Sequence, residues 1–244
     1  MAKNNPRELS EEIQAKLLEE IRHGIYKDAD KLPPENELAA SMGVSRSMIR
    51  ECLTEFEREG LVNRHKGIGT MINRRIVNNP YRIDLVQTFF PLLEELGYKP
   101  SVAHKEMFFS VADSKIAEKL DIQEGEAVLV LEELILADNK PVVYVIDHIP
   151  LNLLKDYKME SGSEAISIFK LIFKYADTDI NVCLSEFHAV GTPARLAGYL
   201  NKKEGDPIVY ISEVGFDIRN VPLMYSEEYL VDGFIPQVIV RKKI

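Results

Sequence analysis

The stretch between residues 32 and 72 limits the fold of this chain more than any other part. Pro33 opens an apolar pattern at helical spacing, and proline is well tolerated where a helix begins. Gly43 then offers a left-handed end to this helix. Ser45 can cap a second helix, whose apolar residues recur at the same spacing until Gly60. The sequence therefore predicts two helices joined by a tight turn.

Two short apolar segments follow the second helix and enclose a turn rich in glycine. We expect strands over residues 61–64 and 70–73, with Gly67 and Gly69 in the turn between them. Glycine lets the backbone approach another molecule closely, because it has no side chain. A helix pair followed by such a hairpin is typical of a winged helix-turn-helix, which is a DNA-binding module.

Polar residues lie where such a module meets DNA. The N-terminal end of the second helix enters the major groove, and arginine there can pair with guanine or with phosphate. A small helical domain with solvated arginines is the alternative, and the hairpin favours DNA binding over it. The predicted DNA contacts are Asn36, Ser45, Arg46, Ser47, Arg50, Lys66, Gly67, Gly69 and Thr70.

The net charge of −9 is unusual for a protein that binds nucleic acid. Lys and Arg equal Asp and Glu in number over residues 1–76, so the acidic excess lies beyond residue 76. Basic residues outnumber acidic ones between Arg46 and Arg75. We therefore expect affinity for DNA to come from local contacts, with little long-range steering.

Length and composition indicate a folded protein of two domains. A chain of 244 residues with 45% hydrophobic content can form two cores. The polar N-terminus and the lack of a long apolar run predict a cytoplasmic protein. Cys52 and Cys183 lack partner spacing, so reduced thiols are expected. We place a DNA-binding domain at 1–73, a linker at 74–84 and a second domain at 85–244.

The second domain contains an internal repeat. Residues 115–144 resemble residues 195–225, with Gly125 matching Gly205 eighty positions later. Each copy predicts a strand, a helix and a hairpin, which implies one antiparallel sheet with pseudo-twofold symmetry and helices over one face. This is an α+β fold. A cleft between the halves could bind a ligand, although the duplication could equally serve folding alone.

These two regions resemble parts of a known protein family. The segment LPPENELAASMGVSRSMIRECL, with the wing after it, resembles the winged helix-turn-helix of GntR-type bacterial transcription regulators. Residues from about 85 onward resemble the UTRA effector domain of the HutC branch, which has a chorismate-lyase-like fold. The resemblance implies that Arg46 and Arg50 are recognition-helix contacts and that residues 66–70 form the wing. Asn36 stands where the family commonly has arginine, so that contact loses its charge.

The effector domain departs from relatives that sense sugar phosphates. Glu133 and Ile135 replace two arginines before the Leu-Ala-Asp turn, and Glu227 replaces another arginine in the last hairpin. The resemblance therefore implies a neutral or cationic small molecule and not a phosphosugar. Ordinary solvated strand residues are the alternative. The predicted effector contacts are Thr88, Phe89, Glu133, Glu186, His188, Ser226 and Glu228.

An enzyme or a metal site would need other features. His104 with Glu106, and Glu186 with His188, each share one face of a strand, so a metal site from these four is conceivable. The alternative function is a DNA-tethered lyase or hydrolase that uses the cleft. No nucleophile elbow, P-loop or zinc-protease motif occurs in the sequence. We predict no catalytic residues, no metal and no cofactor.

The prediction is thus a ligand-responsive transcription regulator, and we expect a repressor. One recognition helix contacts only a few base pairs, so a homodimer on palindromic operator DNA is expected. Edge strands of the effector domain could pair in this dimer. Effector binding would then change the placement of the two winged domains through the 74–84 linker.

Overall fold

The computed structural model describes residues 6–79, 88–158 and 167–241. The chain divides into two compact units, one of residues 1–84 with 237–244 and one of residues 85–236. Among the described residues, no helix is long and apolar enough to cross a membrane. The two units are described in turn.

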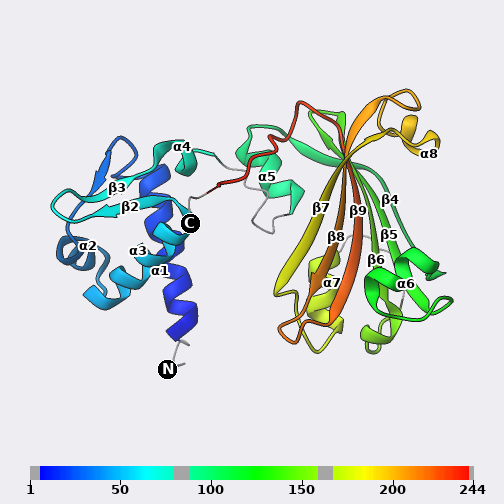
Figure 1. Ribbon diagram of the computed structural model, residues 1–244, viewed down its shortest axis with the longest axis horizontal. Coiled ribbons are helices and arrows are strands. Elements are labelled where there is room, and N and C mark those ends of the chain that lie inside the picture. The colour runs from blue at the N-terminus through cyan, green and yellow to red at the C-terminus, as the bar shows by residue number, and fades with distance from the viewer. Residues whose placement is uncertain (1–5, 80–87, 159–166, 242–244) are drawn as a thin grey trace. The chain divides into compact units, whose positions relative to one another are not determined.

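The first unit contains the predicted helix pair and wing (Figure 1). Its three strands form an antiparallel sheet in the order β1-β3-β2. The sequence did not indicate β1, which has only two residues and pairs with the wing. The elements are α1 (Pro6–Arg22), β1 (Lys31–Leu32), α2 (Glu35–Met42), α3 (Arg46–Glu59), β2 (Val62–His65), β3 (Gly69–Ile72) and α4 (Arg74–Val77).

The ends of α2 and α3 follow the local chemistry of the sequence. Gly43 and Gly60 adopt left-handed conformations, with φ of 69° and 81°, and end the two helices. The Ser45 side chain accepts a hydrogen bond from the Met48 backbone N–H at 3.3 Å and so caps α3. The apolar faces of three helices then form one core, which includes Leu17, Ile21, Leu38, Ile49, Leu53 and Phe56.

The start of the predicted 74–84 linker is a helix that is tied to the first unit. The Arg74 guanidinium donates hydrogen bonds to the carbonyl oxygens of Ile21, Tyr26 and Ala29. Helix α4 follows from this anchor, and Arg22 adds a hydrogen bond to the Val77 carbonyl at 3.2 Å. Residues 74–77, predicted as the start of a linker, therefore form a helix that is anchored to the first unit.

The second unit is built on a six-stranded antiparallel sheet in the order β4-β5-β6-β9-β8-β7 (Figure 1). A 3-10 helix, η1 (Leu151–Leu153), follows β6. The apolar spacing of Ile168, Leu171 and Ile172 predicts a helix over about residues 164–175. This helix begins at Ile168, and residues 164–166 lie outside the described residues. The other elements are α5 (Phe89–Glu95), β4 (Pro100–Val111), α6 (Ser114–Leu120), β5 (Ala127–Ala137), β6 (Lys140–Pro150), α7 (Ile168–Tyr175), β7 (Val182–Gly191), α8 (Ala194–Ala197), β8 (Pro207–Phe216) and β9 (Pro222–Leu230).

The strand order confirms the internal duplication. Strands β4, β5 and β6 run from one edge to the centre, and β7, β8 and β9 do the same from the other edge. The two halves meet where β6 pairs with β9, with Ile146 opposite Glu227. The repeat in the sequence makes these two residues equivalent, so the pseudo-twofold axis passes between them.

The two faces of the sheet have separate cores. Helices α6 and α8 contribute Leu120 and Leu196 to a core with Val130 and Tyr144 on one face. Helix α7 packs its apolar side against Leu129 and neighbouring residues on the opposite face. The prediction that helices cover one face is therefore wrong. Helix α7 lies between the two repeats and belongs to neither, so the repeat did not predict which face it covers.

Candidate nucleic-acid interface and effector site

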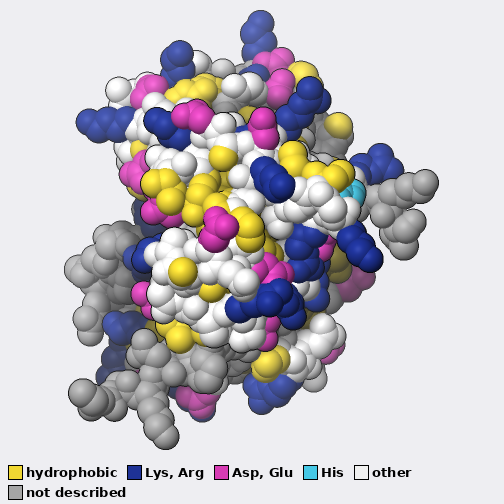
Figure 2. Space-filling model, turned by 90° about the vertical axis from the view of Figure 1, so that its left-hand side faces the viewer, with side chains coloured by type: hydrophobic (Ala, Val, Ile, Leu, Met, Phe, Trp, Pro, Cys, Tyr) yellow, Lys and Arg dark blue, Asp and Glu magenta, His cyan; other side chains and the backbone are white. Residues whose placement is uncertain are grey.

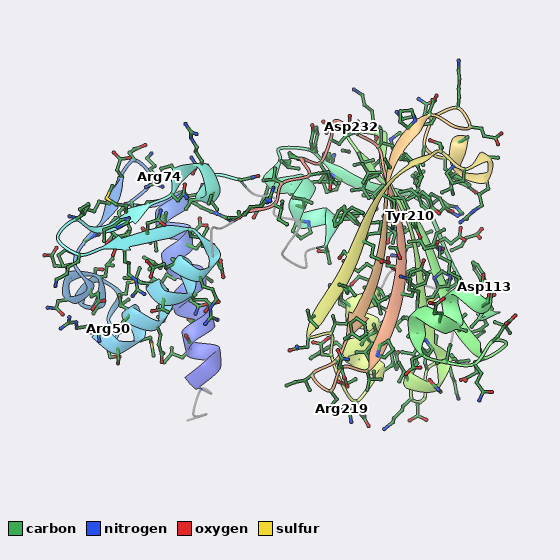
Figure 3. The ribbon with its side chains drawn as sticks, in the orientation of Figure 1. Arg50, Arg74, Asp113, Tyr210, Arg219 and Asp232 are labelled. Carbon is green, nitrogen blue, oxygen red and sulfur yellow. The ribbon has the colours of Figure 1, made fainter. Side chains whose placement is uncertain are left out.

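The N-terminal end of α3 presents its polar side chains to solvent. The Arg46 and Arg50 side chains are 58% and 56% exposed and lie one helical turn apart, and Figure 3 labels Arg50 on α3. Ser45 and Ser47 beside them are also exposed, and their hydroxyl oxygens lie 2.9 Å apart. Asn36 is exposed on α2. The structure thus places the predicted contacts of the helix pair on accessible surface.

A carboxylate from α2 joins the two arginines. Oε2 of Glu35 accepts a hydrogen bond from Nε of Arg46 at 3.0 Å and one from Nη2 of Arg50 at 3.1 Å. Hydrogen bonds from Arg50 and then Arg46 lower the pKa of Glu35, so this carboxyl is ionised at neutral pH. The sequence did not predict this bridge, because it joins residues of two different helices.

The wing is fixed to α3 by a second carboxylate. Oε1 of Glu57 accepts the Arg64 backbone N–H at 2.9 Å, and Oε2 accepts the guanidinium Nε at 2.8 Å. Beyond this anchor, Lys66, Gly67 and Gly69 are exposed at the turn, while Thr70 is half-buried. Gly67 and Gly69 have φ of 85° and 105°, which other residues rarely adopt. The turn can therefore present its backbone and Lys66 to a phosphate.

Basic side chains do not form a continuous patch on the face that Figure 2 shows. Lys and Arg side chains there are interspersed with Asp and Glu side chains. This distribution agrees with the net charge of −9. This surface therefore agrees with the expectation that contact with DNA depends on a few local arginines and the wing.

The α7 side of the large sheet holds a group of polar residues, which we call the carboxylate face: Lys105, Glu133, Asp147, Ser185, Glu213, Ser226 and Glu228. Residues directly opposite in neighbouring strands share a face of the sheet. One row across the strands contains Ser185, Glu213, Ser226 and Asp147. The next row contains Glu228, Val145, Glu133 and Lys105.

The two repeats contribute unequally to the carboxylate face. Glu133 and Glu213 are equivalent, and so are Asp147 and Glu228. Lys105 pairs with Glu133 at 3.2 Å, whereas the equivalent Ser185 donates to Glu213 at 2.5 Å. The face therefore has one lysine for four carboxyl groups.

Burial makes these carboxyl groups costly to ionise. Asp147 is 6% exposed, and burial raises its pKa to about 7, although a hydrogen bond from Ser226 at 2.6 Å opposes the rise. Burial also raises the pKa of the half-buried Glu228, and the charges of Glu213 and Asp147 add to this. Carboxyl groups with shifted pKa values that lie together on one face are typical of a functional site.

The structure brings some predicted effector contacts together and separates others. Glu133, Ser226 and Glu228 share the carboxylate face. Glu186 and His188 lie on the opposite face, where Glu186 pairs with Lys119 of α6 at 2.5 Å. One ligand cannot contact both groups, because the sheet lies between them. The predicted set therefore does not form a single site, and the contact of either group with an effector stays a prediction.

Thr88 and Phe89 lie at the start of α5. Thr88 is the N-cap residue of this helix, but its side chain makes no capping hydrogen bond. It is exposed, and Phe89 is half-buried.

The four residues considered for a metal do not meet. His104 and Glu106 lie on β4, and Glu186 and His188 lie on β7, which are the two edge strands of the sheet. Five strand spacings separate them, or roughly 24 Å along the sheet. Within the described ranges, no group of three or more His, Cys, Asp or Glu side chains could hold a metal ion.

Sequence comparison decides the family. The model described as bacterial regulatory proteins, gntR family, matches residues 9–72, and the UTRA domain model matches residues 69–135 and 110–232. The chain belongs to the GntR family and has a UTRA domain. This regulator is a DNA-binding transcription factor and not an enzyme, and its UTRA domain indicates effector binding. The resemblance to GntR regulators of the HutC branch is confirmed.

Relatives of this regulator match it over most of their length. The uncharacterized HTH-type transcriptional regulator YurK of Bacillus subtilis is 28% identical over 214 residues, which is 86% of each chain. A protein of Escherichia coli named "Probable fructoselysine utilization operon transcriptional repressor" is 26% identical and covers 95% of this chain and 93% of its own. The crystal structure of YydK from Bacillus subtilis has the same fold, with a TM-score of 0.71 at 18% identity over 95% of this chain and 99% of its own.

Several residues of the two sites were not predicted from the sequence. Among them, Asp147, Glu213 and Lys105 belong to the carboxylate face. Uninterrupted pairing outward from the turn at Asp138-Asn139 would place Glu133 opposite Tyr144. A register shift between Ile135 and Leu136 instead places Glu133 opposite Val145, so Asp147 shares the face of Glu133. The turn alone therefore does not predict this face.

Proposed function

We propose that this protein is a repressor whose first unit binds a palindromic operator through the N-terminal end of α3 and the wing. The exposed arginines at one helix end support this proposal most directly. Arg46 and Arg50 can reach base edges, while Lys66 and the turn glycines can reach phosphate. Because chromosomal DNA is the target, we place the protein in the cytoplasm.

Operator binding can be tested without knowing the operator. The full chain is used to select duplexes from a random-sequence library, and the enriched sequence is measured by fluorescence anisotropy against a scrambled duplex. We expect enrichment of two half-sites in inverted order. Failure to enrich any sequence would contradict the proposed function.

We also propose that the protein acts as a homodimer formed by the second unit. The edge strands β4 and β7 present apolar side chains to solvent, among them Phe109 at 50% and Leu184 at 64% exposure. Exposed apolar edge strands are prone to pair with another chain. Light scattering of the full chain should give the mass of two copies, and a monomeric mass at the concentration of operator binding would contradict the proposal.

The effector that we propose is a small molecule with a cationic amine, bound at the carboxylate face. Four carboxyl groups with one lysine leave an excess of negative charge in a sheltered place. A bound ammonium group would lower the pKa of Asp147 and Glu228 and would form ion pairs with their ionised carboxylates. A phosphate group would instead add repulsion.

A relative supports an amine-bearing effector. The name of the Escherichia coli protein reported above, "Probable fructoselysine utilization operon transcriptional repressor", refers to the use of fructoselysine. Fructoselysine, a conjugate of a sugar and lysine, has amino groups. The relative is only 26% identical to this chain, so we propose the chemical class of its compound, an amine, as the effector class and not fructoselysine itself.

A thermal-shift screen tests the effector class. Amines, amino sugars and sugar–amine conjugates are compared with phosphosugars, using wild type, Asp147→Asn and Glu186→Gln. Glu186→Gln is the matched control, because it removes the same charge from the opposite face. We expect an amine to stabilise wild type and Glu186→Gln but not Asp147→Asn. Stabilisation by phosphosugars alone would overturn the proposal.

A further inference from the structure

The Glu35 side chain contacts both arginines of the recognition helix. Its carboxylate accepts a hydrogen bond from Arg46 Nε at 3.0 Å and from Arg50 Nη2 at 3.1 Å, through the same oxygen. Glu35 opens α2, whereas both arginines belong to α3. The contact therefore joins the two helices of the motif at the surface that faces DNA.

The geometry of this contact leaves both arginines able to form hydrogen bonds with DNA. Both guanidinium groups are more than half exposed, while the Glu35 side chain is 24% exposed between them. Arg46 uses Nε and Arg50 uses one Nη, so each guanidinium keeps N–H groups that contact no described residue. Those groups can form the paired hydrogen bonds that guanine accepts in the major groove.

The charge of Glu35 has a second effect. It is ionised, since hydrogen bonds from Arg50 and Arg46 lower its pKa. One negative charge beside two arginines weakens their attraction to phosphate, which every DNA sequence offers equally. It leaves the directional contact to a base edge in place.

We propose that Glu35 is a positioning residue that raises the preference of this protein for its operator over other DNA. It does so by holding Arg46 and Arg50 in one geometry and by reducing their attraction to phosphate. This inference rests on the proposed operator binding, and it adds a role for a residue that need not touch DNA itself.

The test compares Glu35→Gln with wild type on two duplexes, the one selected by the wild-type full chain and a scrambled one. We expect weaker binding to the selected duplex and equal or stronger binding to the scrambled one. The ratio of the two affinities should fall by about tenfold, which is the cost of one misplaced base contact. Binding to the scrambled duplex should also become more dependent on salt.

Glu55→Gln is the matched control for this test. Glu55 lies on α3 and pairs with Arg58 at 3.2 Å, so its substitution removes the same charge without touching Arg46 or Arg50. It should strengthen binding to both duplexes alike and leave their ratio unchanged. Glu35→Asp keeps the charge but shortens the side chain, and we expect it to lower the ratio as well.

Three outcomes would overturn the inference. The ratio could stay at the wild-type value in Glu35→Gln, it could fall equally in Glu55→Gln, or Glu35→Asp could keep the full ratio, which would make charge alone sufficient. Circular dichroism spectra and melting temperatures of each variant exclude loss of folding as the cause. If wild type selects no sequence, the proposed function fails before this inference is reached.

Discussion

The two units of this protein place their charged groups in opposite environments. Arg46 and Arg50 are more than half exposed, whereas Asp147 is 6% exposed and burial raises its pKa. Exposed charges keep their hydration and meet a partner through a few directional contacts. Buried carboxyl groups reduce the stability of the fold and become favourable only beside a positive charge.

This difference in exposure shows how each of the two sites can be recognised in the structure. The DNA-binding site is complete without a partner, because its side chains are already accessible. The carboxylate face lacks positive charge, and that deficit is what indicates the chemistry of the ligand. Substitutions in each unit test one side of this contrast, and their expected effects on stability or binding decrease in the order given.

The largest effect is expected at Asp147. Its pKa of about 7 lies above the ordinary value of 3.8, so between these pH values the folded protein holds a proton that the unfolded chain has lost. The free energy of unfolding therefore falls as pH rises through this window, by on the order of 4 kcal/mol in all. In urea unfolding from pH 5 to pH 8, Asp147→Asn should become progressively more stable than wild type.

The exposed Glu186→Gln serves as the control for this prediction. Its difference from wild type should not change over the same pH range, because the Glu186 carboxyl is solvated and its pKa is lowered by Lys119. If the difference in free energy of unfolding between Asp147→Asn and wild type stayed constant with pH, the raised pKa of Asp147 would be contradicted.

The next effect concerns the recognition helix. Arg46→Ala or Arg50→Ala should weaken binding to the selected operator by about 1–3 kcal/mol, because each removes a contact to a base edge or phosphate. Fluorescence anisotropy at fixed salt measures this. The exposed Arg58→Ala, on the same helix, is the comparison, and wild-type affinity in both arginine variants would show that the interface is assigned wrongly.

A smaller effect is expected from the helix cap. Ser45→Ala removes the acceptor for the Met48 N–H and should lower the stability of the first unit by about 1 kcal/mol. Thermal unfolding of the full chain, followed by helix circular dichroism, measures the change. Ser47→Ala keeps the cap and should cost less; an equal loss in both variants would contradict the capping role.

The smallest effect is expected at the wing. Lys66→Ala should reduce by about one the slope of the logarithm of the binding constant against the logarithm of salt concentration. Selectivity between operator and scrambled duplex should persist, because a phosphate contact is the same for every sequence. A changed base preference at one operator position would show instead that Lys66 contacts a base.

The same contrast explains what the sequence predicted. The helix pair, its caps and the wing depend on residues close together in the chain, so local patterns sufficed. The repeat predicted the six-stranded sheet and its symmetry, since equivalent residues lie at a fixed spacing.

The rest depends on contacts between distant residues. The bridge from Glu35 to Arg46 and Arg50 joins two helices, and the carboxylate face depends on strand register. A shift of one residue moves every side chain to the other face. For this reason Glu186 and His188 were grouped with residues from which the sheet separates them.

The most direct test of the account measures operator affinity with and without an amine that stabilises the wild-type protein. Asp147→Asn should bind the selected operator as wild type does, because it leaves the arginines and the wing unchanged. The amine should weaken operator binding about tenfold or more in wild type and Glu186→Gln, and should have no effect in Asp147→Asn. An amine that weakens binding equally in all three proteins, or that leaves wild-type binding unchanged, would contradict the account.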